Sequence, residues 1–357
     1  MRSIDIPEAI RARIAAGTVI PAIPLALDSR RKFDPEHQRA LVRYYVDAGV
    51  GGLAVGVHTT QFAIREPRYN LYKPVLEAVS GWIDEQAALR GVAVAKVGGV
   101  LGKTAQAKAE AEFLVQAGYH AGLLSMSALK EESIDELIEH AKAIAAIIPI
   151  IGFYLQPDVG GRILPYEFWR RFAQIENVIA IKMAPFNRYR TIDVVRGVCD
   201  SGRVGEVALY TGNDDNIVID LLSEYRFGKA GGAVSARIVG GLLGQWCIWS
   251  KKAVEMHATL RKLASSGQPI PAEILTLAQQ VTDANAVVFD AANGFKGCIP
   301  GIHEVLRRQG LLAGTWCLDP AEAMSPGQAE EIDRVCAAYP HLIDDDFVRA
   351  NLGEWLR

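Results

Sequence analysis

Two patterns of apolar residues alternate along this chain. Short continuous apolar runs predict strands buried on both faces, and longer stretches with an apolar residue every three or four positions predict amphipathic helices. The predicted strands are Val19–Ala26, Gly52–Val57, Val92–Val97, Ala121–Met126, Pro149–Tyr154, Val178–Met183, Glu206–Thr211 and Gly232–Ser235. The predicted helices are Pro35–Ala48, Leu71–Leu89, Thr104–Ala117, Ile134–Ala146, Tyr166–Gln174, Ile192–Cys199, Asn216–Tyr225 and Ile238–Val254. Eight strand–helix pairs predict a (β/α)8 TIM barrel.

After Gly240 the strand pattern stops and only helical patterns follow. These further helices are expected at Pro271–Phe289, Ile302–Leu312, Pro326–Ala338 and Asp344–Leu356. No long Pro-rich or Gly/Ser-rich linker interrupts this region. We therefore predict a barrel core through the eighth strand over residues 1–240. Residues 241–357 are expected to form the eighth barrel helix and a helical C-terminal region packed on the barrel, as one structural unit.

The composition excludes several classes of protein. The chain has 38 basic and 41 acidic residues, a net charge of −3, and no long basic run that would follow a phosphate backbone, so nucleic acid is not an expected partner. No apolar run reaches the roughly 18 residues that a membrane span needs, and the start lacks the pattern of a signal peptide. The five cysteines contain no C-x-x-C pair. We expect a cytoplasmic protein.

Two reactive side chains end neighbouring predicted strands. Lys182 closes the apolar run of the sixth strand, and Tyr154 closes the fifth. Active sites of (β/α)8 barrels lie at the carboxyl ends of the strands. Apolar neighbours disfavour the cationic form of an amine, which frees a neutral nucleophile for Schiff-base chemistry, and a nearby phenol can transfer protons. Each residue alone is typical of a solvated charge or a packed ring, but the pair predicts a catalytic site.

The order of these features resembles the dihydrodipicolinate synthase/N-acetylneuraminate lyase superfamily over nearly the whole chain. The segments that carry the resemblance are Gly51-Gly52-Leu53-Ala54-Val55-Gly56, Gly152-Phe153-Tyr154-Leu155-Gln156-Pro157, Asn177-Val178-Ile179-Ala180-Ile181-Lys182 and Thr211-Gly212-Asn213-Asp214. In that family the matching lysine forms an imine with pyruvate and the matching tyrosine relays protons. The resemblance therefore implies these roles for Lys182 and Tyr154, and a dimer or tetramer of identical chains.

The loop after the second strand departs from the family's Gly-(Ser/Thr)-Thr-Gly-Glu pattern. Here it reads Gly56-Val57-His58-Thr59-Thr60-Gln61-Phe62. Without a gap the family's hydroxyl positions fall on Val57 and His58, and with an insertion they fall on Thr59 and Thr60. We expect the substrate carboxylate to contact Gly56, His58, Thr59 and Thr60.

Two further departures concern the polar partners of the substrate. Ser125-Met126-Ser127 follows the fourth strand, where the synthases have a tyrosine pair, and Val159 stands where they have an arginine, with Arg162 three residues further on. These differences argue against dihydrodipicolinate synthesis and for a different aldehyde half, apolar or aromatic. Gly212 and Asn213 are expected to meet substrate hydroxyls, and Val234 to line the pocket.

The sequence leaves several functions open. We predict a Schiff-base lyase or aldolase acting on pyruvate or another small 2-oxo acid. The alternatives are a 2-oxo acid dehydratase of the same superfamily and a catalytically silent barrel that binds a 2-oxo acid.

Two rivals come from other classes of protein. A nucleotide-binding loop at Gly98–Thr104 is disfavoured because three residues, not four, separate Gly98 from Gly102, and we expect Thr104 to cap the following helix. A metal-dependent lyase is disfavoured because the seven histidines form no ligand cluster. We expect neither metal nor cofactor.

Overall fold

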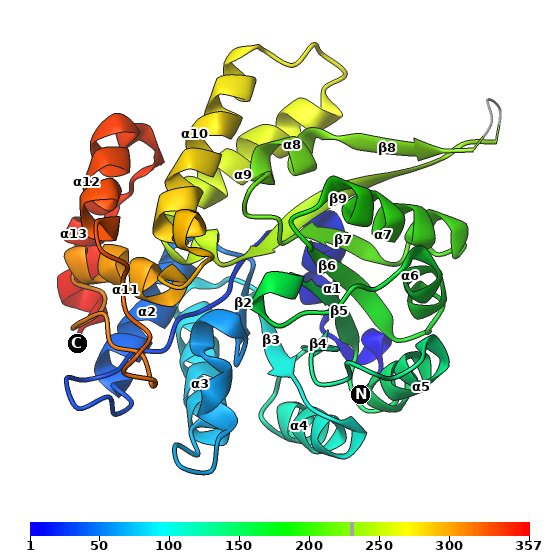
Figure 1. Ribbon diagram of the computed structural model, residues 1–357, viewed down its shortest axis with the longest axis horizontal. Coiled ribbons are helices and arrows are strands. Elements are labelled where there is room, and N and C mark those ends of the chain that lie inside the picture. The colour runs from blue at the N-terminus through cyan, green and yellow to red at the C-terminus, as the bar shows by residue number, and fades with distance from the viewer. Residues whose placement is uncertain (229–231) are drawn as a thin grey trace. The chain divides into compact units, whose positions relative to one another are not determined.

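The computed structural model describes residues 1–228 and 232–357 (Figure 1). The chain divides into two compact units that interleave along the sequence. The first contains Met1–Thr18, Ala95–Leu242 and Leu260–Pro269, and the second contains Val19–Val94, Leu243–Thr259 and Ile270–Arg357. The boundary expected at residue 240 stays a prediction, and each unit is described by itself.

The first unit is built on parallel strands in the order β9-β7-β6-β5-β4-β3. The strands are β3 (Ala95–Val100), β4 (Ala121–Ser125), β5 (Ile150–Leu155), β6 (Val178–Ala184), β7 (Ala208–Thr211) and β9 (Val234–Leu243). The helices are α1 (Glu8–Ala16), α4 (Thr104–Gln116), α5 (Ile134–Ala145), α6 (Tyr166–Ala173), α7 (Arg188–Asp200) and α8 (Ile217–Leu222). Figure 1 shows α4 to α7 following one another along the outer side of β3 to β7.

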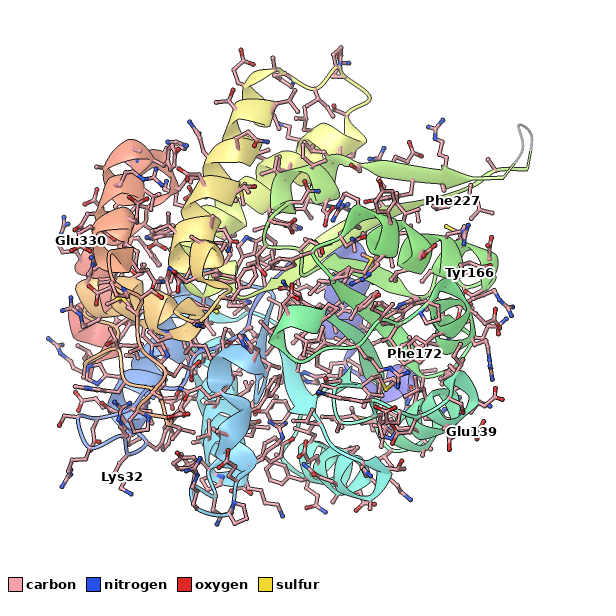
Figure 2. The ribbon with its side chains drawn as sticks, viewed as in Figure 1. Lys32, Glu139, Tyr166, Phe172, Phe227 and Glu330 are labelled. Carbon is pink, nitrogen blue, oxygen red and sulfur yellow. The ribbon has the colours of Figure 1, made fainter. Side chains whose placement is uncertain are left out.

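The packing of α6 on β5 shows how individual residues determine the contact between the helices and the sheet. The helix buries three aromatic side chains, Phe168, Trp169 and Phe172, of which Phe172 is labelled in Figure 2. Gly152 of β5 makes room for them, because a Cβ atom there would lie 2.6 Å from Phe172 Cε1 and 3.1 Å from Trp169 Cζ3. Gly152 therefore faces the helix layer, and its neighbours in the strand face the other side.

The eighth barrel strand differs from the prediction. It begins at Val234 and runs to Leu243, where we expected a strand that ends at Ser235 and a helix from Ile238. Its first part pairs antiparallel with β8 (Glu224–Phe227), which replaces the end of the helix expected at Asn216–Tyr225. Figure 1 shows this hairpin projecting beyond α7, and Figure 2 labels Phe227 on it.

In the second unit, β1 (Val19–Pro21) and β2 (Gly52–Val55) are joined by a parallel bridge between Ala22 and Ala54. The helices are α2 (Pro35–Ala48), α3 (Tyr72–Arg90), α10 (Glu273–Val288), α11 (Cys298–Arg308), α12 (Gln328–Ala338) and α13 (Asp345–Trp355); α9 (Ser250–Ser265) has residues in both units. The last helix is tied to α2 by the indole N–H of Trp355, which donates to Asp47 Oδ2 at 2.9 Å. The C-terminal region is thus helical, as predicted.

Several smaller predictions can be compared directly. The helix Pro35–Ala48 has the predicted bounds, whereas Thr104 is the first residue of α4 and not its cap, and its hydroxyl lies 2.9 Å from His140 Nδ1. All five cysteines are free. Within the described residues, no helix combines the length and apolar character needed to cross a membrane.

Candidate active site

Lys182 lies on the sixth barrel strand with its side chain on the face away from the helices. It is buried, with 7% of its surface exposed. In the β5–β6 register it is the partner of Phe153, and residues paired in a parallel sheet project to the same side. Its Nζ atom lies 4.3 Å from the centroid of the Phe153 ring. The predicted nucleophile therefore stands over an apolar aromatic surface.

Gly212 follows β7 and provides the space that the Lys182 side chain occupies. A Cβ atom at Gly212 would lie 2.6 Å from Lys182 Cε and 2.8 Å from Ala184 Cβ. Both distances are well inside ordinary carbon–carbon contact, so only glycine leaves the lysine in this position. The structure gives Gly212 a steric role beside the lysine, and its predicted contact with substrate hydroxyls stays a prediction.

Tyr154 requires a correction, because its side chain lies on the opposite face of β5 from Phe153. Successive side chains of a strand alternate between faces, so Tyr154 shares the helix side with Gly152. Its ring lies 5.3 Å from that of Trp169, and its hydroxyl accepts a hydrogen bond from Leu164 N at 3.2 Å. Burial raises the pKa of this phenol. The geometry gives Tyr154 a packing role and directs its hydroxyl away from Lys182.

Asn213 also differs from its predicted role, because its side chain is engaged within the protein. Its Oδ1 accepts from Phe186 N at 3.1 Å, and its Nδ2 donates to Asp220 Oδ2 at 3.0 Å and to Thr191 Oγ1 at 3.2 Å. Asp220 is fully buried and is also bound by the guanidinium of Arg188. This network fixes the loops after β6 and β7, and it uses the amide that we expected to meet substrate.

Val234 does not lie at the carboxyl end of its strand. It is the first residue of β9, pairs with Phe227 in the projecting hairpin and is 38% exposed. The predicted position depended on a strand ending at Ser235. Because the strand continues for eight more residues, its carboxyl end is formed by Gly241, Leu242 and Leu243.

The loop after β2, in the second unit, is held by its own threonines. Gly56 has a positive φ of 72°, and a short 3-10 helix, His58–Thr60, follows. The Thr60 hydroxyl donates to Ile23 O at 2.7 Å and accepts from Gly56 N at 3.0 Å, and the Thr59 hydroxyl donates to Ala22 O. Both hydroxyls thus bind backbone groups. The predicted contact of this loop with a substrate carboxylate stays a prediction.

His58 is half-buried on the same short helix, with its ring 5.9 Å from that of Phe62. The loop is also bound by the C-terminal region, since Gln61 Oε1 accepts from Leu318 N at 2.7 Å. This contact was not predicted, because nothing in the sequence links positions 257 residues apart.

Phe153, Ser125 and Ser127 were assigned no role in the site from the sequence. Ser125, at the end of β4, is the partner of Phe153 in the β4–β5 register and is therefore on the same face as Phe153 and Lys182. The alternation of faces along β5 was a usable signal, since small Gly152 marks the side covered by the helices. Within the described residues, no three His, Cys, Asp or Glu side chains are grouped to hold a metal ion. The expectation that no metal is used stays a prediction.

The fold and the site together define a class of protein: a barrel of parallel strands with a buried lysine on its sixth strand. Among family models, that of the dihydrodipicolinate synthetase family matches residues 15–337. The chain belongs to the dihydrodipicolinate synthetase family. A search of curated proteins finds no match.

Solved structures with the same fold confirm the predicted (β/α)8 barrel with a helical C-terminal region. The dihydrodipicolinate synthase of Cyanidioschyzon merolae with lysine bound has a TM-score of 0.72 and 18% identity, covering 92% of this chain and 99% of its own. CdNal from Clostridium difficile in complex with mannosamine has a TM-score of 0.70 and 15% identity, covering 90% and 99%. YagE from E. coli, a prophage protein of the dihydrodipicolinic acid synthase family, in complex with pyruvate, has a TM-score of 0.68 and 16% identity, covering 91% and 98%.

Proposed function

We propose that this protein is a Schiff-base-forming lyase or aldolase that acts on pyruvate or another small 2-oxo acid through Lys182. The observation that carries the proposal is the buried Lys182 amine over the Phe153 ring, in a chain of this family. The pyruvate complex of YagE supports the substrate class.

The chemistry begins with the neutral amine. Nζ adds to the keto carbon of the oxo acid, and loss of water from the carbinolamine leaves a protonated imine. This cation withdraws electrons from the adjacent carbon, so that a C–C bond can break or form there, or a hydroxyl can leave. The face of an aromatic ring attracts cations by about 0.5–2 kcal/mol. Phe153 therefore stabilises the protonated imine, as it also stabilises the ammonium form of the free lysine.

We also propose that the reaction is not dihydrodipicolinate synthesis. Arg162, the basic residue closest in sequence to the position of the synthase arginine, donates to Leu129 O and, at 3.1 Å, to Glu132 O. Its guanidinium thus holds the segment between β4 and α5. An aldehyde half without a carboxylate to be recognised agrees with this arrangement.

Borohydride trapping tests the proposal, because it reduces an imine to a stable secondary amine. Incubation with pyruvate and borohydride should add the mass of the reduced pyruvyl group to the peptide containing Lys182, and Lys182→Ala should abolish both adduct and turnover. Lys96 is a matched control, being buried on β3 but on the side of Gly98, which faces Leu114 of α4. An adduct on Lys96, or none across a broad panel of 2-oxo acids, would refute the proposal.

A specific observation favours one alternative, the catalytically silent binder. The phenol of Tyr154 faces the helix layer, on the other side of β5 from Lys182, whereas the family resemblance implies that this phenol relays protons at the lysine. A silent binder would form the Lys182 adduct but show no product with any oxo acid. A dehydratase would release a new oxo acid without an aldehyde, so direct analysis of products separates the three functions.

We further propose a homo-oligomer, a dimer or tetramer, in the cytoplasm, with a small 2-oxo acid as its partner and without nucleic acid or membrane. Light scattering at micromolar concentration tests the assembly. A monomer would contradict it.

A further inference from the structure

Ser125, the last residue of β4, lies on the face of the sheet that carries Lys182, and Ser127 follows two residues later. Ser125 is the partner of Phe153, and Phe153 is the partner of Lys182, so the three side chains form a row across three strands. Ser125 is buried, with 3% of its surface exposed. Adjacent strands lie about 4.8 Å apart. The backbone of Lys182 is therefore two strand spacings, about 10 Å, from that of Ser125. The lysine amine lies 4.3 Å from the centroid of the Phe153 ring, the middle residue of the row.

A second hydroxyl connects Ser125 to the surface. Ser125 Oγ donates to Ser127 Oγ at 3.1 Å, and Ser127 N donates to Ser125 Oγ at 3.3 Å. Ser127 is half-buried, whereas Ser125 is buried. The two hydroxyls thus form a short chain from the interior face toward solvent.

We propose that Ser125 and Ser127 relay the protons for imine formation at Lys182, the role that the family resemblance implies for Tyr154. This inference rests on the proposed function. A hydroxyl donates one hydrogen bond and accepts two, so a pair of them can pass a proton without either becoming charged.

In the first step the Nζ lone pair forms the C–N bond while the carbonyl π pair moves to oxygen, which takes a proton from Ser125. Ser125 is reprotonated by Ser127 and Ser127 by water, while nitrogen loses one proton to solvent. In the second step the C–O bond breaks, the oxygen leaves as water with a proton from the same chain, and the nitrogen lone pair forms the C=N bond.

A purely structural reading is that the pair closes the turn after β4, since a serine side chain often binds the backbone N–H two residues on. The two readings differ in what the variants do to rate. Ser125→Ala should slow imine trapping and kcat by 10-fold or more, and Ser125→Thr, which keeps the hydroxyl, should retain most of the rate. Ser127→Ala, at a half-buried position, should slow both less than Ser125→Ala while leaving the protein folded.

The experiment measures the rate of borohydride-trapped adduct formation with pyruvate, together with kcat and KM. Ser201→Ala is the matched control, because the Ser201 hydroxyl donates to Val198 O at the end of α7 and takes no part in the row. Loss of rate in Ser125→Ala with unchanged KM and recovery in Ser125→Thr supports the relay.

Two results would overturn it. One is wild-type trapping rates in Ser125→Ala, and the other is equal loss in Ser125→Thr and Ser125→Ala. In both cases the wild-type protein still forms the Lys182 adduct, so the failure of the relay is distinct from failure of the proposed function, in which the wild-type forms no adduct.

Discussion

Gly212 offers the sharpest test of how the site is built, because a single methyl group added there strikes the nucleophile. In Gly212→Ala the new Cβ would lie 2.6 Å from Lys182 Cε, 3.0 Å from Lys182 Cγ and 2.8 Å from Ala184 Cβ. Carbon atoms in favourable contact are about 3.5–4.0 Å apart. The overlap is thus about 1 Å, and the substitution forces a displacement.

The size of the effect follows from which atoms can move. Ala184 Cβ is attached directly to the β6 backbone, whereas the lysine chain can rotate, so Lys182 yields first. Overpacking of this kind costs about 1–3 kcal/mol of unfolding free energy. A reacting group displaced by about 1 Å loses on the order of 10²-fold in rate. We therefore expect a moderate loss of stability and a large loss of imine formation.

The assay is borohydride trapping with pyruvate, followed by mass spectrometry, alongside thermal unfolding. Gly205→Ala is the matched control, since a Cβ atom at Gly205 would meet nothing within 4 Å. The control should trap and unfold like the wild-type protein. If Gly212→Ala traps pyruvate at the wild-type rate, the placement of Lys182 beside Gly212 is incorrect.

Three other outcomes are expected. Tyr154→Phe should lower the unfolding free energy by about 1–3 kcal/mol, because the buried Leu164 N–H loses its acceptor. The same variant should change kcat by less than about 3-fold. A fall in kcat of about 10²-fold would show that Tyr154 relays the protons after all. Burial lowers the pKa of His303 from 6.5 to about 4. Between pH 6.5 and pH 4 the unfolded chain therefore binds more protons at this residue than the folded chain does. The free energy of unfolding should fall by about 3 kcal/mol as the pH drops through this range. Denaturant unfolding of His303→Leu should show a weaker pH dependence, and an unchanged one would contradict this. Asn213→Ala should cost about 1–3 kcal/mol in the same measurement, since it removes the acceptor of Phe186 N and two further hydrogen bonds, and an unchanged midpoint would disprove the structural role.

The fold was largely predictable because its local signals agree with one another. The helix Pro35–Ala48 was predicted to the residue, and the structure shows why: the Asp34 side chain accepts from His37 N at its start, and Gly49 adopts a left-handed conformation at its end. The eighth strand was not predictable in this way. The apolar run from Ile238 fits a helix as well as a buried strand, and the antiparallel partner that extends β9 is a tertiary feature.

The position of Lys182 on the sixth strand could be predicted, because it depends only on an apolar run and on where that run ends, and both are local features. Its catalytic role stays a prediction. The hydrogen-bond partners of Asn213 and Thr60 could not be predicted from the sequence. A polar side chain in a loop gives the same sequence pattern whether it binds a substrate or a backbone group, here Phe186 N and Ile23 O. Tyr154 was assigned a role because it ends the apolar run and matches the family's tyrosine. The alternation of faces from Gly152, which would have placed Tyr154 on the helix side, was not used.

The adjacent aromatic residues of β5 have a consequence for how such proteins diversify. Phe153 lies on the same face of the sheet as Lys182, whereas Tyr154, the next residue, lies on the opposite face. The phenol is therefore one residue along the strand from the position that faces the lysine. The codons of phenylalanine and tyrosine differ at one base. A single base change at position 153 would therefore bring a phenol to the lysine without disturbing Tyr154 or its partner Trp169, and the reverse change removes one as readily. A chain that differs from this one only at position 153 would therefore differ in the group that lies over the lysine amine.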